Sequence, residues 1–191
     1  MFSERINIHN HPRSFVRIIL TLASRDPEAL GFDTSIHWLH NERYLSMQSH
    51  AENKLVDYQI NKSKASFLRR AIRGRGTCCW NVVNPRTKEE YLAKDCWRSA
   101  NRAPEWVLLE KAKGLNGVGQ MVDYWEPELS VGRLRGIDRD TPGFRDRDFC
   151  RVLLERYGKP IHQFDDQKGL LYAFRDAISG KPHFHDHIYS F

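Results

Sequence analysis

The sequence predicts an α+β protein built on an antiparallel sheet of about five strands. Short runs of β-branched and aromatic residues, separated by polar turns, fill the middle of the chain. Apolar residues recur at helical spacing near the two ends and once between the strands. The 191 residues are 40% apolar and 12% aromatic, which is enough for one hydrophobic core. We therefore expect a sheet with one short helix, an N-terminal helical extension and a C-terminal helix.

An N-terminal extension is expected over residues 1–57. Pro12 suits the first turn of a helix, where the missing N–H is not needed, and we expect this helix to end near Ser24. The apolar residues that share one face of it are Phe15, Ile18, Ile19 and Leu22. Strand-like composition then follows in three short runs, GFDTSIHW, RYLSMQSH and KLVDYQIN.

The central segment, residues 58–164, is expected to form the sheet and its short helix. Three consecutive strands are predicted by the runs SFLRRAI, CCWNVV and EYLAKDCW. Pro104 then opens a short helix that Gly114 ends, and two further strands are predicted by GVGQMVDYW and FCRVLLERYG. Between these two strands lies an alternately charged stretch, residues 126–148, which we expect to be a solvated loop inserted into this segment.

Residues 165–191 are expected to begin with one helix, from Asp165 to Ser179. Gly180 and Pro182 follow it and predict its end. The tail beyond them carries three alternating histidines, His183, His185 and His187. An extended segment would project them to one side, where they could bind a metal ion, but no second set of ligands is evident. We therefore predict no metal site.

Cysteine spacing and hydropathy argue against a disulfide-rich, zinc-binding, secreted or membrane-spanning protein. The four cysteines include no C-x-x-C, so neither a disulfide framework nor a zinc site is expected. No apolar stretch approaches the ~20 residues that span a bilayer, and the charged N-terminus does not resemble a signal peptide. We expect an intracellular protein, cytoplasmic or nuclear, with no membrane partner.

The net charge of +6 is concentrated in one stretch. Between Tyr58 and Gly76 there are six basic residues and no acid. Such a run is either a solvated face or a field that attracts phosphate groups. No sequence signature of a nucleic-acid module is present, so nucleic acid is not an expected partner.

A glycine-rich turn between the first two strands of the central segment and a lysine on the third suggest a specific chemistry. The predicted order of three strands, a helix and two strands is that of a protein-kinase small lobe. In such a lobe, glycines let the backbone approach the triphosphate, a lysine on the third strand binds the α- and β-phosphates, and a glutamate on the helix holds the lysine. These parts correspond to Gly74, Gly76, Lys94 and Glu105.

Each part also has a simpler explanation. A Gly-x-Gly between strands is often a plain turn, and a glutamate on a short helix is often solvent-exposed. A lysine inside an apolar strand is harder to dismiss, because a buried ammonium group needs a charged partner or a shifted pKa. Asp95 points to the opposite face of the strand, so we expect Glu105 to be the partner of Lys94, with Glu110 as the alternative.

Longer segments resemble the fungal-type protein kinase family. They are GRGTCCW, KDCWRSANRAPEWVLLEKAKGLNGVGQMVDYW, RVLLERYGKPIHQF and GLLYAFRDAISG, in this order, with RSFVRIILTLASRDPEALGFDTSI upstream. The resemblance covers nearly the whole chain to about Gly180. It implies a kinase-like fold, ATP with magnesium, and Ser/Thr-directed phosphoryl transfer in intact members.

The same resemblance implies further nucleotide-binding residues. Thr77 would lie with the glycines of the turn, and the Glu155 carbonyl and the Tyr157 amide would meet the adenine edge. Leu154 would occupy the gatekeeper position before this hinge, although a leucine there could equally be a core residue and nothing more.

The chain departs from the kinase pattern in two places. The G-x-G-x-x-G-x-V pattern would need glycine at Cys79 and valine at Asn81. No H-R-D loop is present, and neither DRD (Asp138–Asp140) nor DFC (Asp148–Cys150) substitutes for a catalytic motif. Arg145 stands where the first would need asparagine, and the second continues directly into the hinge-like strand. We therefore predict no catalytic residue in these 191 residues.

Two functions remain open from the sequence. The first is an ATP-binding small lobe, a truncated product or a pseudokinase-like remnant, that does not catalyse phosphoryl transfer by itself. The second is a non-enzymatic module, kinase-like or simply a basic α+β domain, that docks onto a protein or an acidic polymer without using ATP. In the first, the side of the lobe that would meet a large lobe, including Leu170, Phe174 and Ile178, is expected to be exposed, and a protein partner would cover it.

Overall fold

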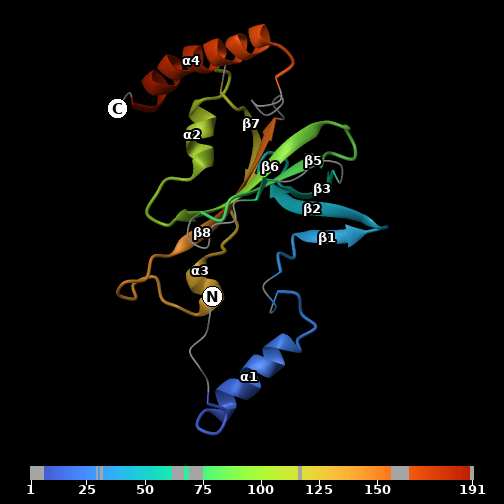
Figure 1. Cartoon of the computed structure of the whole chain (residues 1–191), viewed down its shortest axis with the longest axis vertical. Coiled ribbons are helices and arrows are strands. Elements are labelled where there is room, and N and C mark those ends of the chain that lie inside the picture. The colour runs from blue at the N-terminus through green and yellow to red at the C-terminus, as the bar shows by residue number, and fades with distance from the viewer. Residues whose placement is uncertain are drawn as a thin grey trace.

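The computed structural model describes residues 7–28, 30, 32–61, 67–68, 75–115, 118–155 and 164–189 (Figure 1). Its helices are α1 (Pro12–Leu22), α2 (Glu105–Lys111), α3 (Val131–Arg135) and α4 (Gln167–Tyr189). Its strands are β1 (Ile36–Leu39), β2 (Glu42–Ser49), β3 (Lys54–Ile60), β4 (Phe67–Leu68), β5 (Cys78–Val83), β6 (Glu90–Ser99), β7 (Met121–Trp125) and β8 (Arg147–Glu155). The protein is α+β, as the sequence predicts.

All the strands described join one antiparallel sheet. Its order is β1-β2-β3-β5-β6-β8-β7, and the two-residue β4 pairs with the start of β5. From β4 to β8, with α2 between β6 and β7, the elements follow the order expected for the central segment. The expected count of about five strands is too low, because β1, β2 and β3 extend the same sheet. The expected boundary at residues 57/58 falls inside β3.

The sheet builds a separate apolar cluster on each of its faces, because successive side chains of a strand point to opposite sides. The larger cluster consists of Leu45, Met47, Val56, Tyr58, Ile60, Val82, Ala93 and Leu153. The smaller cluster consists of Cys96, Cys150 and Val152, and α2 covers it with Trp106 and Leu109. The two central strands, β6 and β8, contribute to both clusters.

A fully buried arginine on β8 draws distant parts of the sheet together. Nε and Nη2 of Arg151 donate to the two carboxylate oxygens of Asp95 on β6, at 2.6 and 3.0 Å. Nη1 donates to the Ser35 hydroxyl at 2.8 Å and to the Ser46 carbonyl of β2 at 3.0 Å. Nη2 also donates to Asp33 at 3.1 Å. The chain before β1 and the middle of β2 are thereby held over β6 and β8.

A second polar contact ties the β2–β3 hairpin to β7. The carboxylate of Asp123, itself buried, accepts hydrogen bonds from the Ser49 hydroxyl at 2.5 Å and from the His50 N–H at 3.1 Å. Because β2 and β7 are far apart in strand order, this contact shows that the sheet curls back on itself. The larger apolar cluster lies inside that curl.

The charged stretch 126–148 is not the solvated loop that we expected. It contains α3, which the Ser130 hydroxyl caps by accepting from the Arg133 N–H at 3.1 Å. The buried Asp146 carboxylate accepts from the Gly132 N–H at 2.7 Å. A serine before the helix and Gly136 in a left-handed conformation after it are ordinary helix-end signals, and the charge alternation hid them.

The C-terminal helix extends further than predicted. α4 begins where the Asp166 carboxylate accepts from the Gly169 N–H at 2.6 Å, and it continues to Tyr189. The predicted end at Ser179 is therefore wrong. Proline inside a helix removes one backbone hydrogen bond and commonly breaks the helix, yet here the helix runs on through Pro182. The side chains of the tail histidines lie outside the described part.

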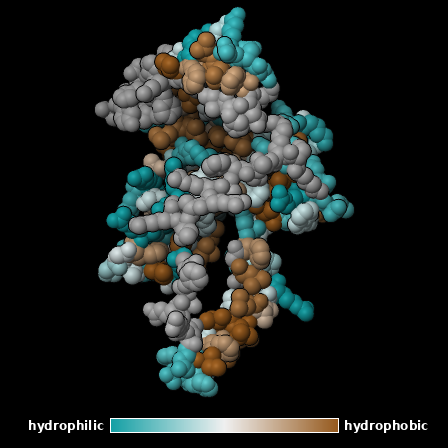
Figure 2. Space-filling view, in the orientation of Figure 1, coloured by the Kyte–Doolittle hydropathy of each residue, from teal (hydrophilic) through white to brown (hydrophobic). Residues whose placement is uncertain are grey.

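The two terminal helices expose much of their apolar surface. α1 begins and ends close to where the sequence predicts, stands apart from the sheet and has no buried residue (Figure 1). α4 crosses the end of the molecule beyond α2 (Figure 1). Apolar residues gather on both helices in Figure 2. Among the described residues, no helix combines the length and hydropathy that crossing a bilayer would require.

Removing the partner of Arg151 should destabilise the fold. An Asp95→Ala variant leaves a buried guanidinium without its bidentate partner, and we expect a loss of roughly 3–5 kcal/mol in the free energy of unfolding. Asp140→Ala, at an exposed loop position, is the control and should change stability by less than about 0.5 kcal/mol. Urea denaturation followed by circular dichroism measures both. Equal stability of the two variants would contradict the role given to Arg151.

Candidate functional site

The candidate site is centred on Lys94, in the middle of the sheet. Lys94 lies on β6 and pairs in register with Cys79 of β5 and Val152 of β8. Its side chain is on the face of the sheet that α2 covers, and it is 26% exposed. A lysine in this position is enclosed enough to need a partner and open enough to meet a ligand.

Glu105 is that partner. The Lys94 ammonium nitrogen lies 2.5 Å from Oε1 of Glu105, whose side chain is 33% exposed. The structure thus confirms the expected ion pair between strand and helix. The alternative, Glu110, instead lies 4.0 Å from Lys113 at the other end of α2. Asp95 is on the opposite face with Arg151, as strand alternation predicts.

The start of α2 favours a carboxylate at this position. Glu105 is the first residue of the helix and Pro104 is its N-cap residue. The N-terminal turn of a helix presents free N–H groups and a partial positive charge, which stabilise a nearby carboxylate. The Glu105 carboxylate therefore lies between the start of the helix and the Lys94 ammonium group.

The glycine-rich turn leads into the strand beside Lys94. Gly76 adopts a left-handed conformation with φ of +54°, and a Cβ atom there would lie 3.3 Å from Cδ1 of Trp97. The Trp97 N–H donates to the Arg75 carbonyl at 2.7 Å. Thr77 is half-buried and lies immediately before β5, which begins at Cys78. Gly76 thus lies between β4 and β5, where the hairpin is predicted; Gly74 is outside the described residues.

The expected hinge follows the end of β8. Leu154 is half-buried and packs against the smaller apolar cluster beneath α2, on the same side of the sheet as Lys94. Glu155 is exposed, and its N–H donates to the Gln120 carbonyl at 3.0 Å. Tyr157 lies outside the described residues. The adenine contacts of Glu155 and Tyr157 therefore stay predictions.

Cys78 and Cys79, on the strand beside Lys94, are poor nucleophiles. Burial raises the pKa of Cys78 to about 11. Burial also raises the pKa of Cys79, although the adjacent Lys94 partly opposes this. Both thiols consequently stay protonated near neutral pH, so we assign them a packing role.

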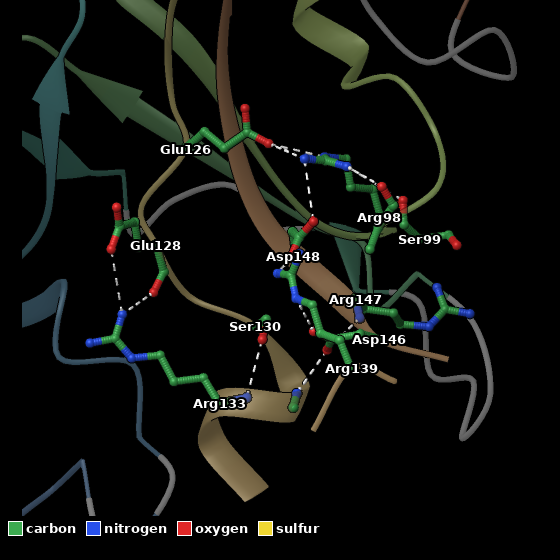
Figure 3. Close-up of polar contacts among 12 residues, drawn as sticks. Arg98, Ser99, Glu126, Glu128, Ser130, Arg133, Arg139, Asp146, Arg147 and Asp148 are labelled. Atoms are coloured by element: carbon green, nitrogen blue, oxygen red, sulfur yellow. Dashed lines mark hydrogen bonds and ion pairs between the residues drawn. The ribbon is translucent and has the colours of Figure 1, made fainter. Parts of the chain in front are cut away.

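A second polar cluster, which the sequence analysis missed, lies at the far end of β6 (Figure 3). Arg98 forms an ion pair with Glu126 at 2.5 Å and lies 3.4 Å from Asp148. Arg139 bridges Asp148 at 2.5 Å and Asp146 at 2.8 Å. Strand alternation could have indicated this cluster, since it places Arg98 on the same face as Lys94 and a second half-buried cation needs acidic partners.

The structure places Asp148, of the DFC motif, within this cluster. Asp148 pairs with Arg98 in the β6–β8 register, four residues along the strand from Lys94. At about 3.4 Å per residue, its backbone is roughly 14 Å along the strands from that of Lys94. Two arginines already occupy the Asp148 carboxylate. Asp140 is exposed on the loop before it.

A cavity of about 540 Å³ lies beside the same cluster and not beside Lys94. Its lining residues are Arg98, Glu126, Pro127, Glu128, Leu129, Ser130, Arg133, Arg139 and Asp148. Its acids and bases largely neutralise one another. In the part of the chain that the structure describes, no three His, Cys, Asp or Glu side chains are grouped so as to hold a metal ion.

Comparison with known proteins identifies the family. A family model described as fungal protein kinase matches residues 1–133. The chain belongs to the fungal protein kinase family. The match includes the glycine-rich turn, Lys94 and Glu105, whereas Leu154 and Glu155 lie beyond it. No curated protein matches, and no solved structure matches.

Proposed function

We propose that this chain is the ATP-binding small lobe of a fungal-type Ser/Thr protein kinase. The observation that carries the proposal is the Lys94–Glu105 ion pair, formed between the third strand of the expected lobe and its helix. Membership of the fungal protein kinase family supports it independently. In kinases this ion pair positions the lysine that binds the α- and β-phosphates.

Each residue of the site would contact a different part of the nucleotide. Lys94 would donate to the α- and β-phosphates while Glu105 holds its ammonium group in place. Gly76 and Thr77, together with Gly74, would place backbone N–H groups over the phosphates. The Glu155 carbonyl and the Tyr157 amide would bind the adenine edge. The partial exposure of Lys94 is consistent with this role, because a phosphate can reach the amine.

Magnesium would neutralise the phosphate charge in intact family members. In the described residues, the acids near Lys94 are already engaged. Asp95 binds Arg151, and Asp123 binds Ser49 and the backbone of the β2–β3 hairpin. We therefore assign no magnesium ligand, and no catalytic step, to these side chains.

A non-enzymatic docking role is the second candidate. The apolar side chains Leu171, Phe174 and Ile178 of α4 are each at least 47% exposed. A surface of this kind suits a protein partner. This role would replace the first if the chain failed to bind nucleotide while α4 bound a protein.

ATP or a non-hydrolysable analogue should bind weakly, because these residues provide one wall of a kinase cleft. We expect a dissociation constant near 1 mM, or roughly 4 kcal/mol of binding free energy. Lys94→Ala should abolish binding, and the matched control Lys113→Ala, at an exposed lysine of the same region, should not. Isothermal titration calorimetry at high protein concentration measures all three. Unchanged binding by Lys94→Ala would refute the assignment of the lysine.

The 191 residues should not transfer phosphate by themselves. Phosphoryl transfer needs a base for the attacking hydroxyl and ligands for the metal ions, and neither an H-R-D loop nor a D-F-G motif is present in them. The assay uses radiolabelled ATP, magnesium and casein, with Lys94→Ala as the control. Incorporation that disappears in the control would show that catalytic groups exist here, and Asp140 and Asp148 would be the first to re-examine.

A further inference from the structure

The position of Glu105 depends on how a very short helix is held. α2 has seven residues, and Glu105 is the first of them. Helices of this length are not stable alone in water, so tertiary contacts must fix where α2 begins and how it is rotated. Three such contacts surround its N-terminal end.

Arg98 holds the loop that leads into α2. Its Nη1 donates to the Arg102 carbonyl at 2.9 Å and, at longer distances, to the carbonyls of Ser99 and Ala100. Its Nε and Nη2 both donate to Oε1 of Glu126, at 3.0 and 2.5 Å (Figure 3). One guanidinium therefore connects the loop to the end of β7.

Glu126 connects Arg98 to the helix itself. While Oε1 accepts from Arg98, Oε2 accepts from the indole N–H of Trp106 at 3.0 Å. The side chains of Arg98 and Glu126 are only 18% and 24% exposed, which limits competition from water. Both carboxylate oxygens of Glu126 thus accept hydrogen bonds from side chains that hold the start of α2.

The indole ring of Trp106 is also fixed by stacking. It lies parallel to the Tyr124 ring of β7, with centroids 4.2 Å apart and planes within 6°. Tyr124 in turn stacks on His50 at 4.5 Å. Trp106 also packs against the smaller apolar cluster. The ring is therefore immobilised against β7 and β8.

We propose that Trp106 and Glu126 are positioning residues for the Lys94–Glu105 ion pair. Successive residues of a helix are separated by about 100° around its axis. Anchoring Trp106 on β7 therefore sets the rotation at which the neighbouring Glu105 meets Lys94 on β6. The proposal deepens the proposed function and rests on it for its consequence in ATP binding, but the geometry it describes exists without nucleotide.

The test measures the acylation rate of each lysine in the full 191-residue chain by mass spectrometry, with an N-hydroxysuccinimide ester as the reagent. Engagement by Glu105 should slow acylation of Lys94, so Glu105→Gln defines the fully released rate. Glu126→Gln, which alters the acceptor, and Trp106→Phe, which removes the indole N–H and part of the stacked ring, should each raise the Lys94 rate by about threefold, the scale of a partly exposed ion pair. Neither should raise it further in the Glu105→Gln background.

Glu128→Gln is the matched control, because that glutamate is two residues away and its side chain is 99% exposed. It should leave the Lys94 rate unchanged. The Lys113 rate and the melting temperature are measured in every variant to detect a general loosening of the fold. Such loosening would raise the acylation rate of Lys113 as well as that of Lys94. An unchanged Lys94 rate in both test variants, beside a faster rate in Glu105→Gln, would overturn the proposal. If wild-type protein binds no ATP while the Lys94 rates follow the expected pattern, the proposed function fails and the positioning role stands.

Discussion

The buried ion pair between Arg151 and Asp95 determines which way β6 faces. A fully buried guanidinium is tolerated only where its hydrogen bonds are satisfied, and Asp95 supplies two of them from the centre of β6. With Asp95 fixed on the curled side of the sheet, alternation sends Lys94 to the other side, where α2 lies. A slip of one residue in the register would bury Lys94 in the larger apolar cluster and expose Asp95 to α2.

The face of β6 that α2 covers carries two cations, and each is paired with a glutamate. Lys94 and Arg98 are four residues apart on this face, with Cys96 between them in the smaller apolar cluster. Each cation meets a glutamate from outside the strand, Glu105 for Lys94 and Glu126 for Arg98. The first pair is open to a ligand, whereas the second is tied into the loop and the helix. One face of β6 therefore carries both the candidate site, at Lys94, and the ion pair that fixes the start of α2, at Arg98.

Local patterns in the sequence were sufficient to predict the Lys94–Glu105 ion pair. Helical spacing and Pro104 predicted α2, alternation assigned Asp95 and Lys94 to opposite faces, and the cost of burying an ammonium group pointed to Glu105. The long-range arrangement could not be predicted in this way. Arg151 precedes an apolar run and has partners more than a hundred residues away in Ser35 and Ser46. For the same reason, the strands before β4 could be predicted individually but not placed in the same sheet.

The central claim, that phosphates bind at Lys94, is tested most directly by nuclear magnetic resonance. ATP is titrated into the labelled chain while the side-chain amine of Lys94 and the backbone amide of Gly76 are observed. The account predicts that both signals shift together along one saturation curve, and that the signal of Lys113 stays in place. Shifts confined to the cavity around Arg133 and Arg139, with Lys94 and Gly76 unmoved, would contradict it.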